Sequence, residues 1–425
     1  MFLGEVIKMD KLNNKVAIIG GGLTGLVAAS ELQKKGYKNV TIFEKEERLG
    51  GKLHTIYYNG RSYELGAIFG LPSQIYLKSL MKELHIKTDG PKLSRINYDS
   101  NGHKIMPIPK VALGDFLKEL DRLPKVLAHY PSLDDIFIHD IEVSLMLPFS
   151  EWCDLHNFNV LKTIYIQYFT IFGLGDINEV PALYVLRILN DKNLMSFMEL
   201  PEFLTWKDGV SSLIKYLIEE IKDIRFGQKV TNIFLSKNEN LWVQTPFETL
   251  EFDQIIITAP LEQYDHLSIM GEGMMEHLSV IKYQSFNVYA IIGKNVPRGC
   301  GCILENLYNY KNGHMILWDS RWDVSNGEEM IIVYAYSPLN NSKESNFEII
   351  KKDLLKLGVC NPRLYQAKLW HHCPYVDTRE LQDGFYNKMA AIQGKNNIFF
   401  AGEIMSTLSM NNCICYAKHL IKRYF

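Results

Sequence analysis

The stretch IIGGGLTGLVAASEL, residues 18–32, contains three glycines in G-x-G-x-x-G spacing. The apolar run 16–19 before them predicts a strand buried on both faces, and the run 23–35 after them predicts a helix that ends at Gly36. In such a unit the glycines permit a tight turn, close approach to a pyrophosphate and close helix–strand packing, and the helix N-terminus faces the phosphates. We therefore predict a dinucleotide site with contacts at Gly20, Gly22, Leu23, Thr24 and Gly25.

A second predicted strand, residues 40–43, is followed by Glu44 and Lys45, which we expect to contact the cofactor. Glu44 lies about 20 residues beyond the glycines, where an acid accepts hydrogen bonds from ribose hydroxyls. Because a carboxylate repels a 2′-phosphate, this residue disfavours NADP. The choice between NAD and FAD stays open on these residues alone.

The composition is that of a soluble globular protein, with 47% hydrophobic residues, 22% charged residues and a formal net charge of -2 over 425 residues. The length predicts two or three domains, and the charge argues against nucleic acid as a partner. His371, His372 and Cys373 are adjacent and do not share one face, so we predict no metal site. With no evident leader and no apolar run of the roughly 18 residues that span a membrane, we expect a cytoplasmic protein.

The segment after Glu44 narrows the choice of dinucleotide. RLGGKLHT, residues 48–55, resembles the R-x-G-G-x-x-x-T motif of the flavin-containing amine oxidase superfamily. This resemblance implies FAD rather than NAD, held through Arg48, Gly51 and Lys52. Segments 207–209, 229–233, 253–260 and 398–403 also resemble pieces of that superfamily's flavin domain. The further contacts expected with FAD are Gly66, Ala67, Ile68, Val230, Gly402 and Glu403.

We expect an α/β fold like that of the amine oxidases, in which a Rossmann-like FAD-binding domain is discontinuous. Its expected pieces are residues 1–72, 204–262 and 384–425, with a helical cap at 73–203 and an α+β substrate domain at 263–383. Helical apolar spacing predicts helices at 112–127 and 157–172. Strands are expected at 286–292, 315–318 and 330–336, and a capping box from Ser345 to Glu348 predicts a helix start.

Several segments resemble one group within the superfamily, the FAD-dependent polyenoic fatty acid isomerases of bacteria. These are RSYELGAIFGLPS (61–73), DGPKLSR (89–95), SLMLPFSEW (144–152), FTIFGLGDINEVPALYVLRIL (169–189), LMSF (194–197), TWKDG (205–209) and FFAGEIMS (399–406). The resemblance implies an isomerase in which oxidised flavin N5 takes a hydride from a bis-allylic methylene and returns it to an end carbon, giving a conjugated diene. It is looser over residues 263–383 and constrains the substrate less there.

By the same resemblance, Arg95 holds the carboxylate of a polyunsaturated free fatty acid such as linoleic acid, and Phe172 and Phe197 flank the reacting carbons. A guanidinium binds a carboxylate bidentately, and each aromatic face stabilises a passing cation by roughly 0.5–2 kcal/mol. Hydride transfer needs no base, so we interpret Glu64 as structural. Two alternatives remain, an FAD-dependent oxidase or desaturase acting on an apolar substrate and a non-catalytic lipid-binding flavoprotein.

The sequence departs from the isomerases after Ser406, where it reads TLSMNNCICYAKHL. The acidic, aromatic turn that the isomerases carry at this point is missing, and residues 406–415 are expected to pass near the flavin. Amine oxidases often bind their flavin covalently through a cysteine in this region, which makes Cys413 and Cys415 candidates for such a bond. The resemblance to the isomerases implies instead that FAD is bound non-covalently.

Overall fold

The computed structural model describes residues 12–105, 112–199, 203–219, 221–261, 269, 272–308, 312–322, 327–336 and 342–425. A five-stranded sheet in the order β17-β11-β1-β2-β7 forms the predicted dinucleotide-binding region. Every neighbouring pair in it is parallel, as predicted for a Rossmann-like unit. Its strands are β1 (Lys15–Ile19), β2 (Asn39–Phe43), β7 (Asp223–Arg225), β11 (Gln254–Ile257) and β17 (Ile398–Phe400).

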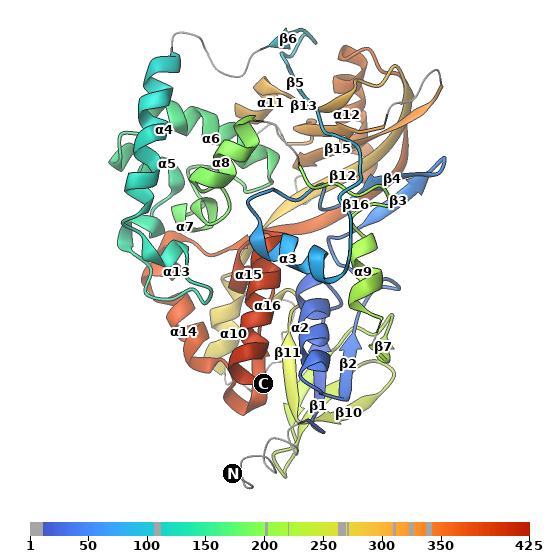
Figure 1. The fold of residues 1–425 in the computed structure, drawn as a ribbon, viewed down its shortest axis with the longest axis vertical. Helices are drawn as coiled ribbons and strands as arrows, with labels where there is room; N and C mark the ends of the chain where they lie inside the picture. Colours follow the sequence, from blue (N-terminus) through green and yellow to red (C-terminus); the bar gives the residue numbers. More distant parts are fainter. Residues whose placement is uncertain are drawn as a thin grey trace.

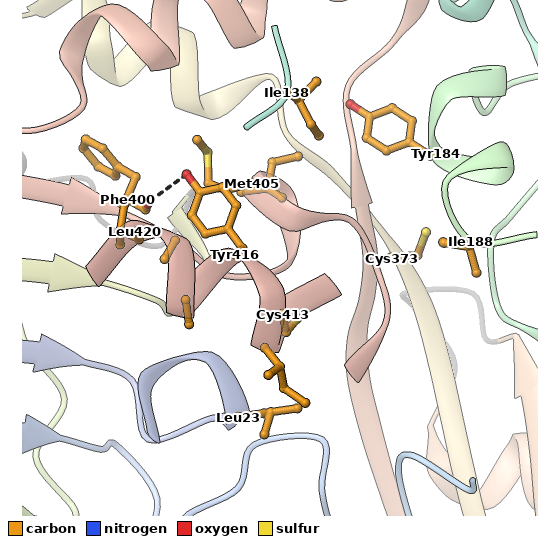
Figure 2. Packing of buried hydrophobic residues seen from close by; sticks show 14 of the residues in the cluster. Leu23, Ile138, Tyr184, Ile188, Cys373, Phe400, Met405, Cys413, Tyr416 and Leu420 are labelled. Atoms are coloured by element: carbon orange, nitrogen blue, oxygen red, sulfur yellow. Dashed lines mark hydrogen bonds between the residues drawn. The ribbon is translucent and has the colours of Figure 1, made fainter. Parts of the chain in front are cut away.

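Helices α2 (Leu23–Lys34), α3 (Ile75–Glu83) and α16 (Met410–Tyr424) pack together beside this sheet (Figure 1). The first of them follows β1 directly and buries most of its length, because a helix between parallel strands is covered on several sides. Tyr416 of α16 donates a hydrogen bond of 3.2 Å to the carbonyl of Phe400, which joins the C-terminal helix to β17 (Figure 2). The N- and C-terminal parts of the chain therefore form one core.

A two-stranded hairpin, β3-β4, lies away from the parallel sheet, at the right of Figure 1, whereas a three-stranded antiparallel sheet, β10-β9-β8, completes the part of the fold near the parallel sheet. Helices α9, α10, α14 and α15 also belong to this half of the molecule in the view of Figure 1. The bounds of these elements are β3 (Thr55–Tyr58), β4 (Arg61–Glu64), β8 (Asn232–Leu235), β9 (Leu241–Gln244), β10 (Thr249–Phe252), α9 (Ser212–Leu217), α10 (Glu272–Ser279), α14 (Phe385–Ile392) and α15 (Glu403–Ser406).

The second large sheet has seven strands in the order β16-β12-β15-β14-β13-β5-β6. It is antiparallel except where β5 runs parallel to β13, with Arg95 paired to Cys300. Helices α11 and α12 accompany it. The bounds are β5 (Arg95–Tyr98), β6 (Lys104–Ile105), β12 (Lys282–Lys294), β13 (Gly299–Ile303), β14 (Leu317–Ser320), β15 (Glu329–Tyr336), β16 (Cys360–Tyr375), α11 (Leu304–Tyr308) and α12 (Lys343–Lys356).

A group of helices lies beside the seven-stranded sheet and above the parallel sheet in Figure 1. Its core holds a cluster of aromatic side chains, in which Phe149 and Trp152 stack with ring centroids 5.7 Å apart. The helices are α4 (Leu113–Leu127), α5 (Phe149–Leu155), α6 (Asn159–Ile171), α7 (Ala182–Leu186), α8 (Asp191–Glu199) and α13 (Thr378–Gln382). None of the helices in the described residues is long and apolar enough to cross a membrane.

Most predicted elements are present, with three differences. The region expected to be a helical cap also supplies β5 and β6, because a four-residue strand gives too little alternation to be recognised and its partner β13 is about 200 positions away. The helix predicted to start at Ser345 begins at Lys343, because the side chain of Ser342 accepts the N–H of Ser345 and is the N-cap. The strand predicted at 315–318 lies at Leu317–Ser320. The domain boundaries themselves remain a prediction.

Candidate functional site

One cavity of about 490 Å³ extends from the glycine turn after β1 to the strand that carries Arg95. The parallel sheet, the helical group and the seven-stranded sheet all contribute to its wall. The predicted cofactor contacts that line it are Gly20, Gly22, Leu23, Thr24, Glu44, Lys45, Arg48, Gly51, Lys52, Gly66, Ala67, Ile68, Val230, Gly402 and Glu403. Arg95 and Phe172 also line it, whereas Gly25 lies behind the wall. Phe197 is in α8, but its side chain lies outside the described residues.

The three glycines of the opening motif play different roles in the structure. Gly20 has φ +105°, and a Cβ there would lie 2.8 Å from the Thr258 hydroxyl oxygen. At Gly25 a Cβ would lie 2.1 Å from the carbonyl oxygen of Gly20, so this glycine lets α2 pack onto the turn. A Cβ at Gly22 would meet no protein atom within 4 Å and would point into open space at the cavity wall. The turn is therefore a cradle that a side chain would fill, as a diphosphate site requires.

Glu44 is held in place at the end of β2 by the backbone. Its Oε2 accepts a 2.8 Å hydrogen bond from the N–H of Gly21, and its Oε1 accepts a 2.9 Å bond from the N–H of Glu46. The side chain is buried but lines the cavity. Because each carboxylate oxygen can accept more than one hydrogen bond, the orientation fits recognition of ribose hydroxyls.

Arg48 orders the diglycine turn beside this acid. Its Nη2 donates a 2.8 Å hydrogen bond to the carbonyl of Gly51 and lies 3.1 Å from Glu46 Oε2. The other oxygen of Glu46 pairs with Lys368 at 2.7 Å, and both cations lie over the ring of Trp370 at 5.7 and 5.0 Å. Lys368 and Trp370 line the cavity but carry no motif, so sequence reasoning missed them.

A further part of the predicted cofactor site is held together by contacts of Lys52. The carbonyl of Lys52 accepts a 2.9 Å hydrogen bond from the N–H of Ala67, and a Cβ at Gly66 would lie 1.9 Å from the same oxygen. The Lys52 ammonium pairs with Glu403, which opens α15 after Gly402 at φ +95°. Segments far apart in the chain are thereby fixed next to one another along the cavity.

The other end of the cavity is built by β5 and α6. Arg95 Nη1 donates a 2.8 Å hydrogen bond to the hydroxyl of Tyr168, and Phe172 follows Tyr168 by one helical turn. The carbonyl of Phe172 accepts a 2.8 Å hydrogen bond from Nε2 of His372. His372 stacks on Phe286 with ring centroids 5.0 Å apart, and burial lowers the pKa of this imidazole to about 3. The ring is therefore neutral at physiological pH and adds no positive charge beside Phe172.

A β-bulge in β16 follows His372. The pairing register with β12 shifts between Lys282 and Gln284, and Cys373 adopts φ +48° at this point. His371, His372 and Pro374 all line the cavity beside this bulge. Among the residues that the structure describes, no group of three His, Cys, Asp or Glu side chains is arranged to hold a metal ion.

A family model with the description "Flavin containing amine oxidoreductase" matches residues 23–414. The chain belongs to this family. It is therefore a flavin enzyme with the α/β amine-oxidase fold that the sequence predicted.

Solved structures and curated relatives support this assignment. A crystal structure of a CLA-producing fatty acid isomerase from P. acnes superposes with a TM-score of 0.90 at 29% identity, covering 97% of this chain and 99% of that one. A putative protoporphyrinogen oxidase from Exiguobacterium shares the fold, with a TM-score of 0.69 at 19% identity over 96% and 98% of the two chains. An FAD-dependent oxidoreductase of Colletotrichum higginsianum is 24% identical over 93% of this chain and 89% of its own length. A polyenoic fatty acid isomerase of Ptilota filicina is 22% identical over 40% of each.

Glu64 does not line the cavity of this flavin enzyme and has a different role. Its Oε2 accepts a 2.7 Å bond from the Thr55 hydroxyl, and its Oε1 accepts a 2.9 Å bond from the N–H of Val210. The fully buried Arg321 lies 3.6 Å from Oε1, pairs with Asp319 and donates a 3.1 Å bond to the carbonyl of Ile68. These contacts link β4 to the second sheet, which agrees with a structural Glu64. The role of Arg321 had no sequence signal.

The segment that departs from the isomerases folds into the start of α16. The side chain of Ser409 accepts the N–H of Asn412 and is the N-cap. Asn411 Oδ1 accepts the N–H groups of Tyr76 at 2.9 Å and Leu77 at 3.4 Å, which satisfies two donors at the start of α3. The segment that departs from the isomerases therefore joins α16 to α3.

We expect Asn411→Ala to lower the free energy of unfolding by about 1 kcal/mol, because two N–H groups of α3 lose their acceptor. Urea unfolding of the purified protein measures this difference. Asn411→Asp keeps an oxygen acceptor and is expected to retain most of the stability, whereas Asn238→Ala in the exposed β8–β9 turn should change little. Equal losses for Asn411→Ala and Asn411→Asp would contradict the capping role.

Proposed function

We propose that the protein is an FAD-dependent double-bond isomerase of polyunsaturated free fatty acids. The observation that carries the proposal is the cavity that joins the predicted flavin residues to Arg95, with Phe172 and Phe286 among the residues of its wall. A fatty acid fits such a shape, with its carboxylate at the arginine and its hydrocarbon chain toward the flavin end. The similarity over nearly the whole chain to a CLA-producing fatty acid isomerase supports the same class of substrate.

When bound, the flavin supplies a hydride acceptor that can return the same hydride to an end carbon of the pentadienyl cation, so that a conjugated diene forms without net redox. Arg95 fixes one end of the chain and thereby sets which methylene reaches the reaction centre. Phe172 presents an aromatic face that stabilises a delocalised cation by roughly 0.5–2 kcal/mol. The neutral His372 holds the Phe172 carbonyl and keeps positive charge away from that cation.

Phe197 is proposed as the second flanking aromatic from the resemblance alone, since its side chain lies outside the described residues. Phe286 and Tyr283 add aromatic surface to the cavity wall from β12. Together these side chains would exclude water, which would otherwise trap a carbocation as an alcohol. The site thus needs no acid–base residue, in agreement with the structural position of Glu64.

Non-covalent binding of FAD is part of the proposal. Cys413 lines the cavity at the start of α16, with its Sγ 3.5 Å from the Ser406 hydroxyl. Burial raises the pKa of this thiol, which leaves little of the nucleophilic thiolate. Cys415 is not a residue of the cavity wall, and its Sγ instead lies 3.7 Å from Nδ1 of His419.

We expect acid denaturation to release all of the yellow cofactor into solution as FAD. Colour that stays with the protein would contradict non-covalent binding.

A second candidate is an FAD-dependent oxidase or desaturase; a segment of 71 residues, 17% of this chain, is 48% identical to 13% of a 1-hydroxycarotenoid 3,4-desaturase of Flavobacterium. Both reactions begin with the same hydride removal, so the fate of that hydride separates them. We propose incubating the protein with linoleate that carries deuterium on its bis-allylic methylene. Conjugated-diene absorbance with the label retained in the product supports the isomerase. Loss of the label together with peroxide identifies an oxidase, and no reaction with any polyene favours a lipid-binding flavoprotein.

A further inference from the structure

Three charged side chains lie together behind the wall of the cavity: Glu64 at the end of β4, Asp319 in β14 and Arg321 directly after β14. Each of these side chains is 1% exposed or less, and none of them lines the cavity. Arg321 Nε donates a 2.8 Å hydrogen bond to Asp319. Its Nη1 lies 3.6 Å from Glu64 Oε1 and has no hydrogen-bond partner among the described residues. We call Glu64, Arg321 and Asp319 the charge network, in which two buried carboxyl groups share one guanidinium.

Each member of the charge network is one contact away from a residue of the cavity wall. Its guanidinium donates a 3.1 Å hydrogen bond to the carbonyl of Ile68. Asp319 accepts a 3.4 Å hydrogen bond from the thiol of Cys300, and the hydroxyl of Tyr334 donates a 3.0 Å bond to the backbone carbonyl of Glu64. The three wall residues contacted in this way all line the cavity. The charge network therefore lies directly behind a stretch of wall that includes Ile68, one of the predicted cofactor contacts.

Several groups influence the charge of Glu64, and most of them stay neutral. Burial raises the pKa of the Cys300 thiol and of the Tyr334 hydroxyl well above their ordinary values. Burial lowers the pKa of the Arg321 guanidinium, but the carboxyl groups beside it outweigh burial and raise this pKa overall, so Arg321 stays charged. The groups around Glu64 in the described residues are Thr55 and Tyr57 of β3, the N–H of Val210, Cys300 of β13, Asp319 and Arg321 at β14, and Tyr334 of β15.

Glu64 is thus the member that can change the net charge of the network near neutral pH. Burial raises its pKa to about 7, although Arg321 and two hydrogen bonds lower it. With Glu64 protonated, the charges of Arg321 and Asp319 cancel. With Glu64 ionised, the network carries one net negative charge behind the wall.

A net charge at this place acts on a bound flavin through the protein interior. A hydride consists of one proton and two electrons, so its uptake adds one negative charge to the cavity. Buried charges are screened much less than exposed charges. A negative charge behind the wall therefore opposes hydride uptake, whereas a neutral network does not.

We propose that the charge network sets the affinity of the bound flavin for a hydride, with Glu64 as its variable charge. Glu64 and Arg321 are then positioning residues, because they act through the wall and touch neither substrate nor cofactor. Arg321 also fixes the carbonyl of Ile68 on that wall. The inference rests on the cofactor position in the proposed function and needs no isomerisation.

The reduction potential of the flavin-loaded protein tests the charge network without any substrate. We would titrate wild type and Glu64→Gln anaerobically against a reference dye from pH 5 to pH 9. The two potentials should lie closest at pH 5 and separate through pH 7, because only wild type gains a charge. Above pH 8 the ratio of reduced to oxidised flavin at a given potential should be about tenfold lower in wild type, a shift of about 30 mV for a two-electron couple.

A second variant moves the pH at which the potential changes. Asp319→Asn leaves the charge of Arg321 to Glu64, so Glu64 should ionise more readily and the change should move below pH 6. Glu328→Gln removes a surface carboxylate that pairs with Arg363 and is the matched control, with the wild-type profile as its expected result.

A difference between wild type and Glu64→Gln that is absent or constant at every pH overturns the proposal, because a purely structural Glu64 does not follow ionisation. The proposed isomerase fails in a different way. A protein that isomerises linoleate while its flavin potential is independent of Glu64 disproves the role of the charge network and keeps the isomerase. A protein whose potential depends on Glu64 but which converts no polyene supports the charge network and disproves the isomerase.

Discussion

Alanine at Gly22 is expected to weaken flavin binding at least tenfold without weakening the fold, whereas alanine at Gly25 is expected to destabilise the fold by about 3 kcal/mol. Gly22 has φ -75° and ψ 178°, which alanine adopts without strain, and its Cβ would meet no protein atom within 4 Å. The methyl group would instead occupy the space in which the diphosphate approaches the backbone. At Gly25 the same methyl group would collide with the Gly20 carbonyl oxygen at 2.1 Å and push α2 away from the turn.

Flavin titration and urea unfolding of flavin-stripped protein measure the two effects separately. Without flavin, the free energy of unfolding of Gly22→Ala should lie within about 0.5 kcal/mol of that of wild type. Gly114→Ala in α4, where a Cβ also has no neighbour within 4 Å, is the matched control and should leave flavin affinity unchanged. Wild-type flavin affinity in Gly22→Ala would falsify the assignment of this turn to the diphosphate.

The glycine turn could be predicted because all of its determinants are contiguous. Strand, turn, helix and Glu44 follow one another within about 30 residues, and each local preference agrees with the final structure. The same holds for the long helices α4 and α6, whose apolar spacing is strong. The family resemblance also singled out Arg95 and Phe172. They lie in separate segments of the sequence, and the structure places both on the wall of one cavity.

Side chains whose role depends on distant partners could not be predicted. Arg321 resembles a surface charge in the sequence, and only the fold shows that it is buried against Asp319 and holds the Ile68 carbonyl. Lys368 contacts Glu46 across 322 positions of the chain. His372 stands beside His371 and Cys373 in the sequence, and only the fold shows that it donates to the carbonyl of Phe172. In each case the contacts of the side chain depend on burial or on strand register, which no local sequence pattern determines.

Between roughly pH 4.5 and 7, the free energy of unfolding of wild type is expected to fall by about 3 kcal/mol relative to that of the Glu64→Gln variant. Burial raises the pKa of Glu64 from its ordinary value of 4.5 to about 7, despite the nearby Arg321. Arg321 does not reverse this shift in pKa, because Asp319, which it contacts more closely, already neutralises its charge. The folded protein therefore keeps a proton on Glu64 at pH values where the unfolded chain has released it.

The sign of the effect follows from this difference in proton binding. The folded state binds more protons than the unfolded state between pH 4.5 and 7, so the stability contributed by Glu64 falls as the pH rises through this window. It is fully present below pH 4.5 and lost above pH 7. Glutamine cannot ionise, so the variant should gain on wild type from pH 5 to pH 7, and the difference should level off above pH 7.

Urea unfolding at pH 5, 6, 7 and 8 checks this prediction through the difference in unfolding free energy between the two proteins. Glu328→Gln is the control, because Glu328 lies on the surface and pairs with the exposed Arg363 at 2.7 Å, where solvent screens the charge. Its pH profile should run parallel to that of wild type. If the Glu64→Gln profile also runs parallel to wild type, Glu64 is ionised throughout and Arg321, rather than burial, determines its charge.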